Sequence, residues 1–352
     1  MLMRGGTSKG VFFLKEDLPG NDQQRDDLLL RIVGSPDPRQ IDGVGGAHPL
    51  TSKVAIVNRS DEDGVDVDFL FVQVNVQKPT VDTTPNCGNI LAAVGPFAIE
   101  RGLVTAISPE TRVRVRTLNT GTRAELVVRT PNGQVEYGGS ERIDGVPGTA
   151  SPIPINFLDT AGSVCGVLFP TGQRCDLIDA IEVTCIDNGM PVVLLRAEDF
   201  GFLGTESCAE LEAARETLSQ IEAIRLKAGS LMRLGDVTDA VVPKMCLISV
   251  GGEGICINTR SLIPRTCHAS IGVFAAVSVA TACVLPGTIA APVARCPEGN
   301  VKLLEIGHPT GTIQVRLETS GPSEDPTVER GGITRTARVL FDGLVFPGPI
   351  RD

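Results

Sequence analysis

The stretch that decides the fold is the uncharged run CGNILAAVGPFAI at residues 87–99. It predicts an apolar helix from about residue 87 to 101, kinked or interrupted at Gly95-Pro96. Apolar or alternating segments on both sides of it, such as residues 54–57 and 65–76, predict strands. This order of elements is typical of a helix wrapped by a sheet.

A second apolar helix is predicted over residues 268–285, where SIGVFAA at 270–276 is loosely similar to CGNILAA at 87–93. Strand-like segments surround this helix as well. We therefore expect an α+β protein of two similar domains. Each domain is expected to be a largely antiparallel β-sheet wrapped around a central apolar helix.

Length and composition agree with two domains. The chain has 352 residues, of which 42% are hydrophobic and 21% charged, enough for two cores of ordinary size. The best linker is the Pro- and Gly-rich piece DGVPGTA at residues 144–150. The expected domains are therefore residues 1–148 and 149–352, and a last strand at about 336–352 could return to the first domain.

Charge and aromatic content argue against two classes of partner. A formal net charge of −10 is unlike that of a protein that binds duplex nucleic acid through a basic face. With one tyrosine and no tryptophan, stacking platforms for single strands are not expected either. The uncharged run at 271–293 is long enough for a membrane span, but its prolines and small residues favour a buried helix and a loop. We expect neither nucleic acid nor membrane as a partner.

The cysteine and histidine content of the sequence bears on metal binding and on the cellular compartment of the protein. The ten cysteines are scattered singly, without a C-x-x-C pair, and there are three histidines. A zinc site therefore has few plausible ligand sets, and we expect no metal and no cofactor. The first residues show no secretory signal pattern, so the cytoplasm is the predicted location.

Lys53 is the first candidate for chemistry, because lysine is scarce in this chain. It opens the apolar run KVAIV at 53–57 and follows the turn-like GGAHPLTS at 45–52. Its amine is therefore expected at a strand edge facing a cleft, where a desolvated lysine can act as a general base. The alternative is a surface lysine with a buried stem and an amine in water.

Cys87 is the second candidate, and it precedes the first apolar helix in PNCGN at residues 85–89. Asn86 is expected to cap this helix. The amides of Cys87, Gly88 and Asn89 then point outward, where a helix N-terminus favours an anion. A thiol there can exchange protons, whereas a buried and chemically silent cysteine is the alternative.

The N-terminal loop RGGTSKG at residues 4–10 combines glycines, hydroxyls and two cations. It lacks the spacing of a nucleotide-binding P-loop, so ATP or GTP is not expected. Two interpretations stay open for it: a loop that cradles a carboxylate and a simple turn into a strand.

Polar residues in the second half are further candidates. His268 and Ser270 start the second apolar helix, and His308 lies in a loop between two late strands. Either histidine could donate to an anion, although a structural role is the alternative. Arg233 follows a surface helix predicted over residues 205–228 and could clamp a carboxylate.

Taken in order along the chain, these motifs resemble the PrpF family. They are RGGTSKG (4–10), GSPDP (34–38), QIDG (40–43), GGA (45–47), TSK (51–53), NCGN (86–89), AAVGPFAI (92–99), Gly235, His268-Ala269, PGT (286–288) and GHPTG (307–311). The family contains methylaconitate cis-trans isomerases and 4-oxalomesaconate tautomerases and has the diaminopimelate epimerase fold. The resemblance runs over essentially the whole chain.

The resemblance implies Lys53 and Cys87 as a catalytic acid/base pair, facing each other across a cleft between two similar domains. It also implies substrate contacts. These are Arg4, Gly6, Thr7, Ser8, Ser52, Asn86, Gly88, Asn89, Arg233, His268, Ser270, His308, Thr310 and Gly311. In diaminopimelate epimerases the second helix begins with another catalytic cysteine. Here that position resembles Ser270, or Ala269 if the alignment slips by one, so a two-cysteine racemase is not expected.

Within the family, AHPL (47–50), DTTPNC (82–87) and TCHAS (266–270) look more like the oxalomesaconate tautomerases than the methylaconitate isomerases. The resemblance thus implies a cofactor-independent 1,3-proton shift on 4-oxalomesaconate, in the degradation of aromatic acids such as gallate and protocatechuate. The alternatives are 2-methylaconitate cis-trans isomerisation and a carboxylate-binding protein without turnover. The expected partner is a small unsaturated di- or tricarboxylate, and a homodimer is the candidate assembly.

Overall fold

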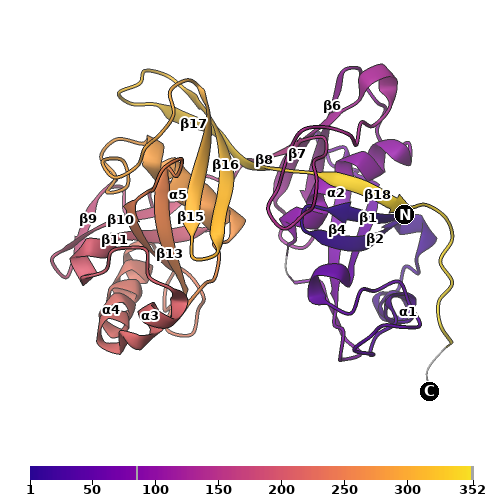
Figure 1. The fold of residues 1–352 in the computed structure, drawn as a ribbon, viewed down its shortest axis with the longest axis horizontal. Coiled ribbons are helices and arrows are strands. Elements are labelled where there is room, and N and C mark those ends of the chain that lie inside the picture. Colours follow the sequence, from indigo (N-terminus) through magenta and orange to yellow (C-terminus); the bar gives the residue numbers. More distant parts are fainter. Residues whose placement is uncertain (85, 350–352) are drawn as a thin grey trace. The chain divides into compact units, whose positions relative to one another are not determined.

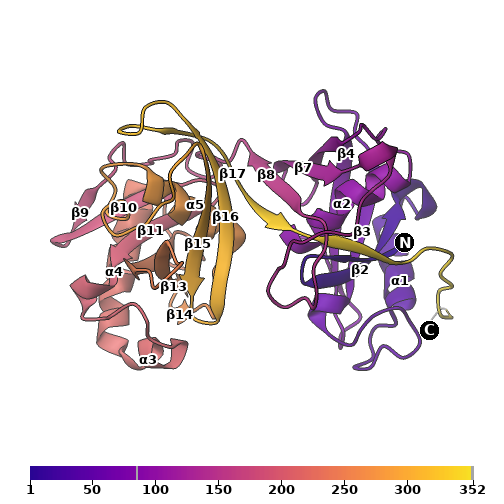
Figure 2. The same ribbon diagram turned by 45° about the horizontal axis from the view of Figure 1, so that its top comes forward.

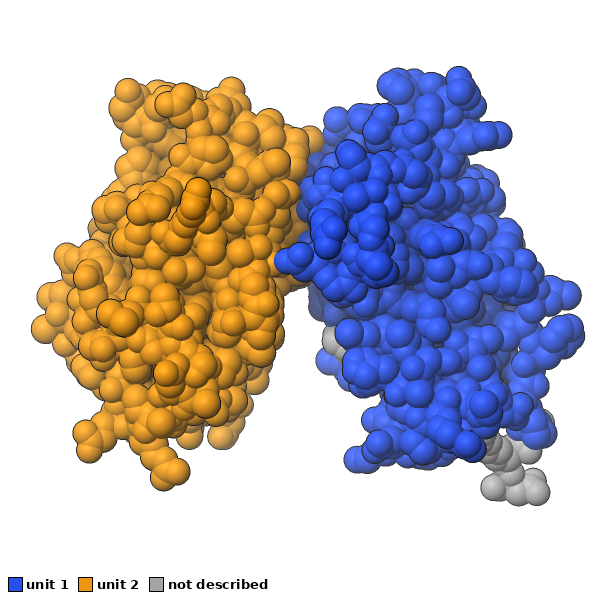
Figure 3. All heavy atoms as spheres, viewed as in Figure 1, with its two compact units in different colours: residues 1–158, 334–352 blue, residues 159–333 orange. Residues whose placement is uncertain are grey.

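The computed structural model describes residues 1–84 and 86–349. It divides into two compact units (Figure 3). Unit 1 comprises residues 1–158 and 334–352, and unit 2 comprises residues 159–333. Each unit is built mostly of sheet with few helices, which confirms the expected α+β class. The division lies after residue 158 instead of residue 148, because the strand Ile153–Leu158 pairs with a strand of unit 1.

Unit 1 contains one mixed sheet and two helices (Figure 1). Its strands are β1 (Leu2–Gly5), β2 (Ser8–Leu14), β3 (Lys53–Arg59), β4 (Val67–Val74), β5 (Val81–Asp82), β6 (Glu110–Thr117), β7 (Arg123–Arg129), β8 (Ile153–Leu158) and β18 (Ala337–Phe341); its helices are α1 (Asp22–Val33) and α2 (Gly88–Glu100). The β2–β3 and β4–β6 pairs are parallel. The other pairs, β18–β1, β1–β2, β3–β4, β4–β5, β6–β7 and β7–β8, are antiparallel.

Helix α2 is the centre of unit 1. It contacts β1, β2, β3, β4, β6, β7 and β18, so the sheet wraps around it (Figure 2). The ring centroids of Phe12 on β2 and Phe97 on α2 lie 5.6 Å apart. Alternate residues of a strand face opposite sides. The other side of β3 and β4 therefore packs on α1, through residues such as Val54, Val72 and Leu29.

Unit 2 repeats this plan with its own elements (Figure 1). Its strands are β9 (Asp176–Ile178), β10 (Ile181–Asp187), β11 (Pro191–Arg196), β12 (Lys244–Val250), β13 (Ile257–Ile263), β14 (Thr266–Cys267), β15 (Val301–His308), β16 (Gly311–Ser320) and β17 (Thr327–Arg335), of which the last two residues, Thr334 and Arg335, belong to unit 1; its helices are α3 (Cys208–Ala213), α4 (Arg215–Leu231) and α5 (Val273–Val284). The β11–β12 and β13–β15 pairs are parallel and the others antiparallel. The apolar helix α5 contacts β10, β11, β15 and β16, as α2 contacts its own sheet.

The helix bounds differ from those predicted. α2 continues through Pro96 without interruption, although proline has no backbone N–H to donate. Strands pack around the helix and stabilise the turn that lacks this hydrogen bond. The single helix predicted over 205–228 is two helices, since Ala214 between them adopts a non-helical conformation. Short 3-10 turns occur at Lys15–Asp17, Pro49–Thr51, Pro131–Gly133 and Ala197–Phe200. In the part of the chain that the structure describes, no helix is both long and apolar enough to cross a bilayer.

Candidate active site

The first group of candidate residues lies on the side of the unit 1 sheet that faces α2. Gly10, Lys53 and Gln73 stand directly opposite one another on β2, β3 and β4, so they share one side of the sheet. A Cβ atom on Gly10 would lie 3.2 Å from Cδ1 of Ile90, which places the first turn of α2 over this row. Ser8 lies two residues before Gly10 and faces the same way.

The amine of Lys53 is enclosed. The residue is 7% exposed, and Nζ donates a 2.6 Å hydrogen bond to Oε1 of Gln73. Nζ also lies 5.0 Å from the ring centroid of Phe71. Within residues 1–84 and 86–349, Lys53 has no ion pair with a carboxylate. The burial excludes an amine held in bulk water and agrees with the interpretation of Lys53 as a base.

Cys87 occupies the N-cap position of α2, where Asn86 was expected. No side chain caps this helix end, because Asn86 turns away and donates its amide to the hydroxyl of Thr120. The first backbone N–H groups of a helix have no partner inside the helix. The amides at Gly88 and Asn89 are therefore free to bind an anion beside the half-buried thiol of Cys87.

Two glycines allow the β1–β2 turn to pack closely against the start of α2. A Cβ atom on Gly5 would lie 2.4 Å from the carbonyl oxygen of Asn89. On Gly6, which has a φ of +51°, it would lie 2.1 Å from Oδ1 of Asn89. The backbone N–H of Thr7 donates to that same Oδ1 at 3.4 Å. The two glycines let this turn approach α2 more closely than any side chain would permit.

Ser8 is a buried hydroxyl with an unused hydrogen-bonding capacity. It is 2% exposed, and its Oγ has no hydrogen-bond partner in the described part of the chain. Buried polar groups in folded proteins are nearly always paired. An unpaired hydroxyl on the side of the sheet that faces the first turn of α2 is suited to accept or donate to a ligand.

Arg335 joins this site and was missed from the sequence, where nothing local distinguishes it from many other arginines. Its Nε donates to Oδ1 of Asn89 at 3.3 Å, and its Nη1 donates to the carbonyl of Thr334 at 2.9 Å. Burial lowers the pKa of Arg335, and no carboxylate pairs with it among the described residues. A half-buried cation beside an uncapped helix end is a strong candidate for binding an anionic group.

Two other predicted contacts in unit 1 have internal partners. Ser52 is 1% exposed, and its hydroxyl bonds to Oε1 of Gln40 at 2.7 Å and to the carbonyl of His48 at 2.9 Å. Arg4 donates through Nη1 to the carbonyls of Gly6 and Thr336, and burial together with the charge of Arg338 lowers its pKa. These bonds shape the loops before Lys53 and around Gly6.

A second group of predicted residues comes together in unit 2, where they precede α5 instead of starting it. The helix begins at Val273, because β14 and the His268 N–H bond back to β13. Ser270 Oγ lies 3.2 Å from Nε2 of His308, and Thr310 Oγ1 donates to the carbonyl of Ala269 at 2.8 Å. The turn His308–Gly311 is thereby joined to the segment 268–270.

The surroundings of His308 favour its neutral form. Burial is the main cause of its lowered pKa, and the charges of His268 and Arg260 act in the same direction. Nδ1 accepts from the backbone N–H of Thr310 at 3.3 Å, so the ring proton of the neutral form lies on Nε2 and points to Ser270. The hydroxyl proton of Ser270 is then available to another acceptor.

Arg233 stands apart from this cluster. Its side chain is exposed, and none of the hydrogen bonds or ion pairs of the described residues connects it to His268 or His308. Its backbone adopts a φ of +61° directly after the C-cap of α4, a conformation more typical of glycine.

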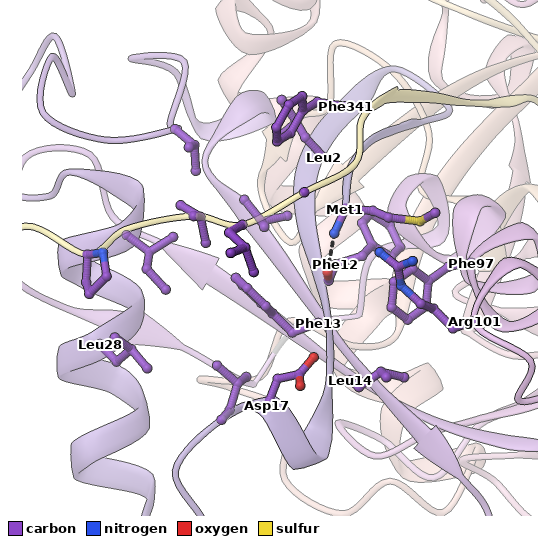
Figure 4. Close-up of a pocket in the computed structure, with 18 residues that line it drawn as sticks. Met1, Leu2, Phe12, Phe13, Leu14, Asp17, Leu28, Phe97, Arg101 and Phe341 are labelled. Carbon is purple, nitrogen blue, oxygen red and sulfur yellow. Dashed lines mark hydrogen bonds between the residues drawn. The ribbon is translucent and has the colours of Figure 1, made fainter.

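Two cavities of unit 1 are lined by neither Lys53 nor Cys87. A cavity of about 450 Å³ in unit 1, between Phe12, Phe97, Arg101 and Phe341, is lined by none of the predicted site residues (Figure 4). Another of about 400 Å³ is lined by Arg4 and Arg338. In the described residues, no group of three or more His, Cys, Asp or Glu side chains is arranged to hold a metal ion.

Comparison with known proteins gives a consistent result. Residues 1–347 match the family model described as PrpF protein. The chain is 55% identical over 346 residues to the (4E)-oxalomesaconate Delta-isomerase of Novosphingobium sp., covering 98% of this chain and 96% of that protein. It is 54% identical over 348 residues to the 4-oxalomesaconate tautomerase of Pseudomonas putida, covering 99% and 95%.

More distant relatives have different substrates in their names. The 2-methyl-aconitate isomerase of Shewanella oneidensis is 36% identical over 379 residues, covering 97% of this chain and 95% of that protein. Among solved structures, a methylitaconate-delta-isomerase superposes with a TM-score of 0.86 at 34% identity, covering 97% of this chain and 93% of the other.

Proposed function

Because this chain belongs to the PrpF family, we propose that it is a cofactor-independent isomerase that shifts a proton along the allylic system of 4-oxalomesaconate. The observation that carries the proposal is the buried amine of Lys53, without a carboxylate partner, on the side of the sheet that meets the uncapped start of α2. An amine in this environment can accept a carbon-bound proton. The identity of 54–55% to two proteins with oxalomesaconate in their names favours this substrate.

The proposed reaction is a proton removal followed by a proton return. Lys53 takes a proton from the carbon next to a conjugated carbonyl, and the bonding electron pair passes into the conjugated system to give a dienolate. Cys87 or a bound water returns a proton at the other end, so the double bond has moved and no atom is gained or lost. Donors directed at the developing negative charge supply the electrostatic part of the catalysis.

The substrate carboxylates need donors, and the described site contains them. The amides of Gly88 and Asn89, the hydroxyl of Ser8 and the guanidinium of Arg335 are proposed to hold one carboxylate. Asn86, Gly6, Thr7, Ser52 and Arg4 are proposed to contact the substrate or to hold the loops that do. In unit 2 the proposed contacts are His268, Ser270, His308, Thr310, Gly311 and Arg233. A local field of this kind permits a chain of net charge −10 to bind a polyanion.

The function is tested by incubating the wild-type protein in deuterated buffer with 4-oxalomesaconate and, separately, with 2-methylaconitate. Proton NMR follows the double bond and the label. We expect rapid migration of the double bond with deuterium incorporation from 4-oxalomesaconate. Faster turnover of 2-methylaconitate would support isomerisation of that compound instead. Tight binding without exchange of either compound would indicate a binding protein.

Arg335→Met is expected to raise KM for 4-oxalomesaconate far more than it lowers kcat. A hydrogen bond to a charged group contributes about 1.5–3 kcal/mol, which corresponds to a loss of roughly 10- to 150-fold in kcat/KM. Arg335→Lys, which keeps the charge, should lose less. Arg114→Met is the matched control, because Arg114 is exposed and belongs to the same unit. Unchanged kinetics in Arg335→Met would remove this residue from the site.

A further inference from the structure

We propose that Gln73 is a positioning residue for Lys53, which holds the amine in place through a neutral acceptor and so leaves it available as a base. The inference rests on the proposed function, in which Lys53 removes the proton. Nothing in the sequence motifs points to Gln73, which lies inside an ordinary alternating strand. Its importance appears only from the pairing of β3 with β4, where Gln73 stands directly opposite Lys53.

The orientation of the Gln73 amide is determined by its surroundings. Its Nε2 donates to three backbone carbonyls, those of Pro49 and Ser52 at 3.1 Å and that of Val74 at 3.3 Å. A reversed amide would turn its oxygen toward three carbonyl oxygens, which is repulsive, so Oε1 faces Nζ of Lys53. The backbone around residues 49–52 therefore fixes the amide orientation in which the 2.6 Å bond to Lys53 forms.

The neutral character of this partner matters for the chemistry. A carboxylate near a lysine favours the ammonium form, which cannot accept a proton. An amide oxygen can accept a hydrogen bond from the ammonium or the free amine. By contrast, the exposed Lys227 pairs with Asp179. Gln73 thus holds the amine in one place without a negative charge beside it.

The charged and titratable groups of the neighbouring elements leave this arrangement intact. They include Lys9 on β2, His48 before the turn Pro49–Thr51, Asp82 on β5 and Cys87 at the start of α2. Asp68 lies at the other end of β4, opposite Asn58, and pairs with Arg116. Asp82 stands opposite Gln73, but it is exposed, and its Oδ1 accepts from the backbone N–H of Thr84 at 2.8 Å. None of the four forms a hydrogen bond or an ion pair with Lys53 among the described residues.

The test compares Gln73→Glu and Gln73→Met with the wild type in kcat, KM and pH profile. Gln73→Glu places a carboxylate beside the amine. It is expected to move the pH at which kcat reaches half of its plateau upward by about one to three pH units, because an opposite charge at that distance favours the ammonium. Gln73→Met removes the acceptor without adding charge. It should lower kcat about 10-fold, with KM and the pH profile close to those of the wild type.

The matched control is Gln77→Glu, an exposed glutamine just beyond β4 with the same change of charge, which should leave the profile unaltered. A purely structural role for Gln73 would lower stability or the amount of active enzyme without moving the profile. Thermal melting of each variant identifies that case. A profile for Gln73→Glu that coincides with the wild type would overturn the proposal.

A measurement without substrate separates this proposal from the proposed function. Cyanate carbamylates only the free amine, and mass spectrometry of the peptide that contains residue 53 gives its rate. We expect that rate at neutral pH to fall at least several-fold in Gln73→Glu. If the carbamylation rate falls in Gln73→Glu while the wild type converts no substrate, the positioning role of Gln73 is supported and the proposed function is not. If it is unchanged in an active enzyme, the positioning role is refuted.

Discussion

Lys53→Met is expected to lower kcat for 4-oxalomesaconate by at least about 1,000-fold while leaving KM nearly unchanged. Positioned acid and base groups each contribute typically about 10² to 10⁴-fold, and no second lysine lies in the row formed by Gly10, Lys53 and Gln73 to replace it. Methionine retains most of the side-chain volume over Phe71, so the sheet should remain folded.

The measurement is the initial rate of double-bond migration, with deuterium exchange into the substrate as a second readout. Lys78→Met is the control, because Lys78 is exposed in the loop before β5. Near-ultraviolet circular dichroism should show both variants folded. If Lys53→Met retains more than about a tenth of the wild-type rate, far above what loss of a general base leaves, another residue is the base.

Arg225→Met is expected to lower the free energy of unfolding of unit 2 by about 3–5 kcal/mol, the usual cost of breaking a buried ion pair by removing one partner. Arg225 is 0% exposed, and its Nε lies 2.7 Å from Oε2 of Glu222. Its other nitrogens donate to the carbonyls of Val237, Ala240 and Val242 at 2.9–3.3 Å. Methionine would leave these buried acceptors unpaired.

Urea denaturation followed by circular dichroism measures this loss. The control is Arg265→Met, which removes the other, exposed partner of Glu222 and should cost no more than about 1 kcal/mol. The bond from Arg225 lowers the pKa of Glu222 from its ordinary value of 4.5. This contribution is present above pH 4.5 and is lost as the pH falls below it, so Arg225→Met should also be less sensitive to acid in that range. Equal stability of both variants would contradict the prediction.

Local sequence patterns were sufficient for the architecture. The apolar runs that become α2 and α5 lack charge on every face, and such helices are stable only when they are enclosed. An apolar run at residues 54–57 predicted β3, and alternation at residues 65–76 predicted β4, each to within a few residues, because the side-chain period is a property of the strand itself. The motifs around Lys53 and Cys87 indicated the family, and the family match over residues 1–347 confirmed the family.

Element ends and caps were predicted less well. Asn86 has the better capping side chain, yet Cys87 takes the N-cap, because Asn86 bonds to Thr120 on a distant turn. His268 and Ser270 were expected on α5 and instead precede it, since β14 directly before them pairs with β13 and the backbone N–H of His268 bonds to the carbonyl of Ser261. In each case a contact between remote parts of the chain outweighed a local preference of about 1 kcal/mol.

The local periodicity and motifs of the chain thus determined two helix-centred sheets and the identity of Lys53 and Cys87 as candidates. Only tertiary structure decided which residues surround them. Strand register placed Gln73 opposite Lys53, and a strand end 246 positions away in the chain brought Arg335 to Asn89. The reason is physical: periodicity depends on neighbours a few residues apart, whereas register and long-range pairs depend on how whole elements pack.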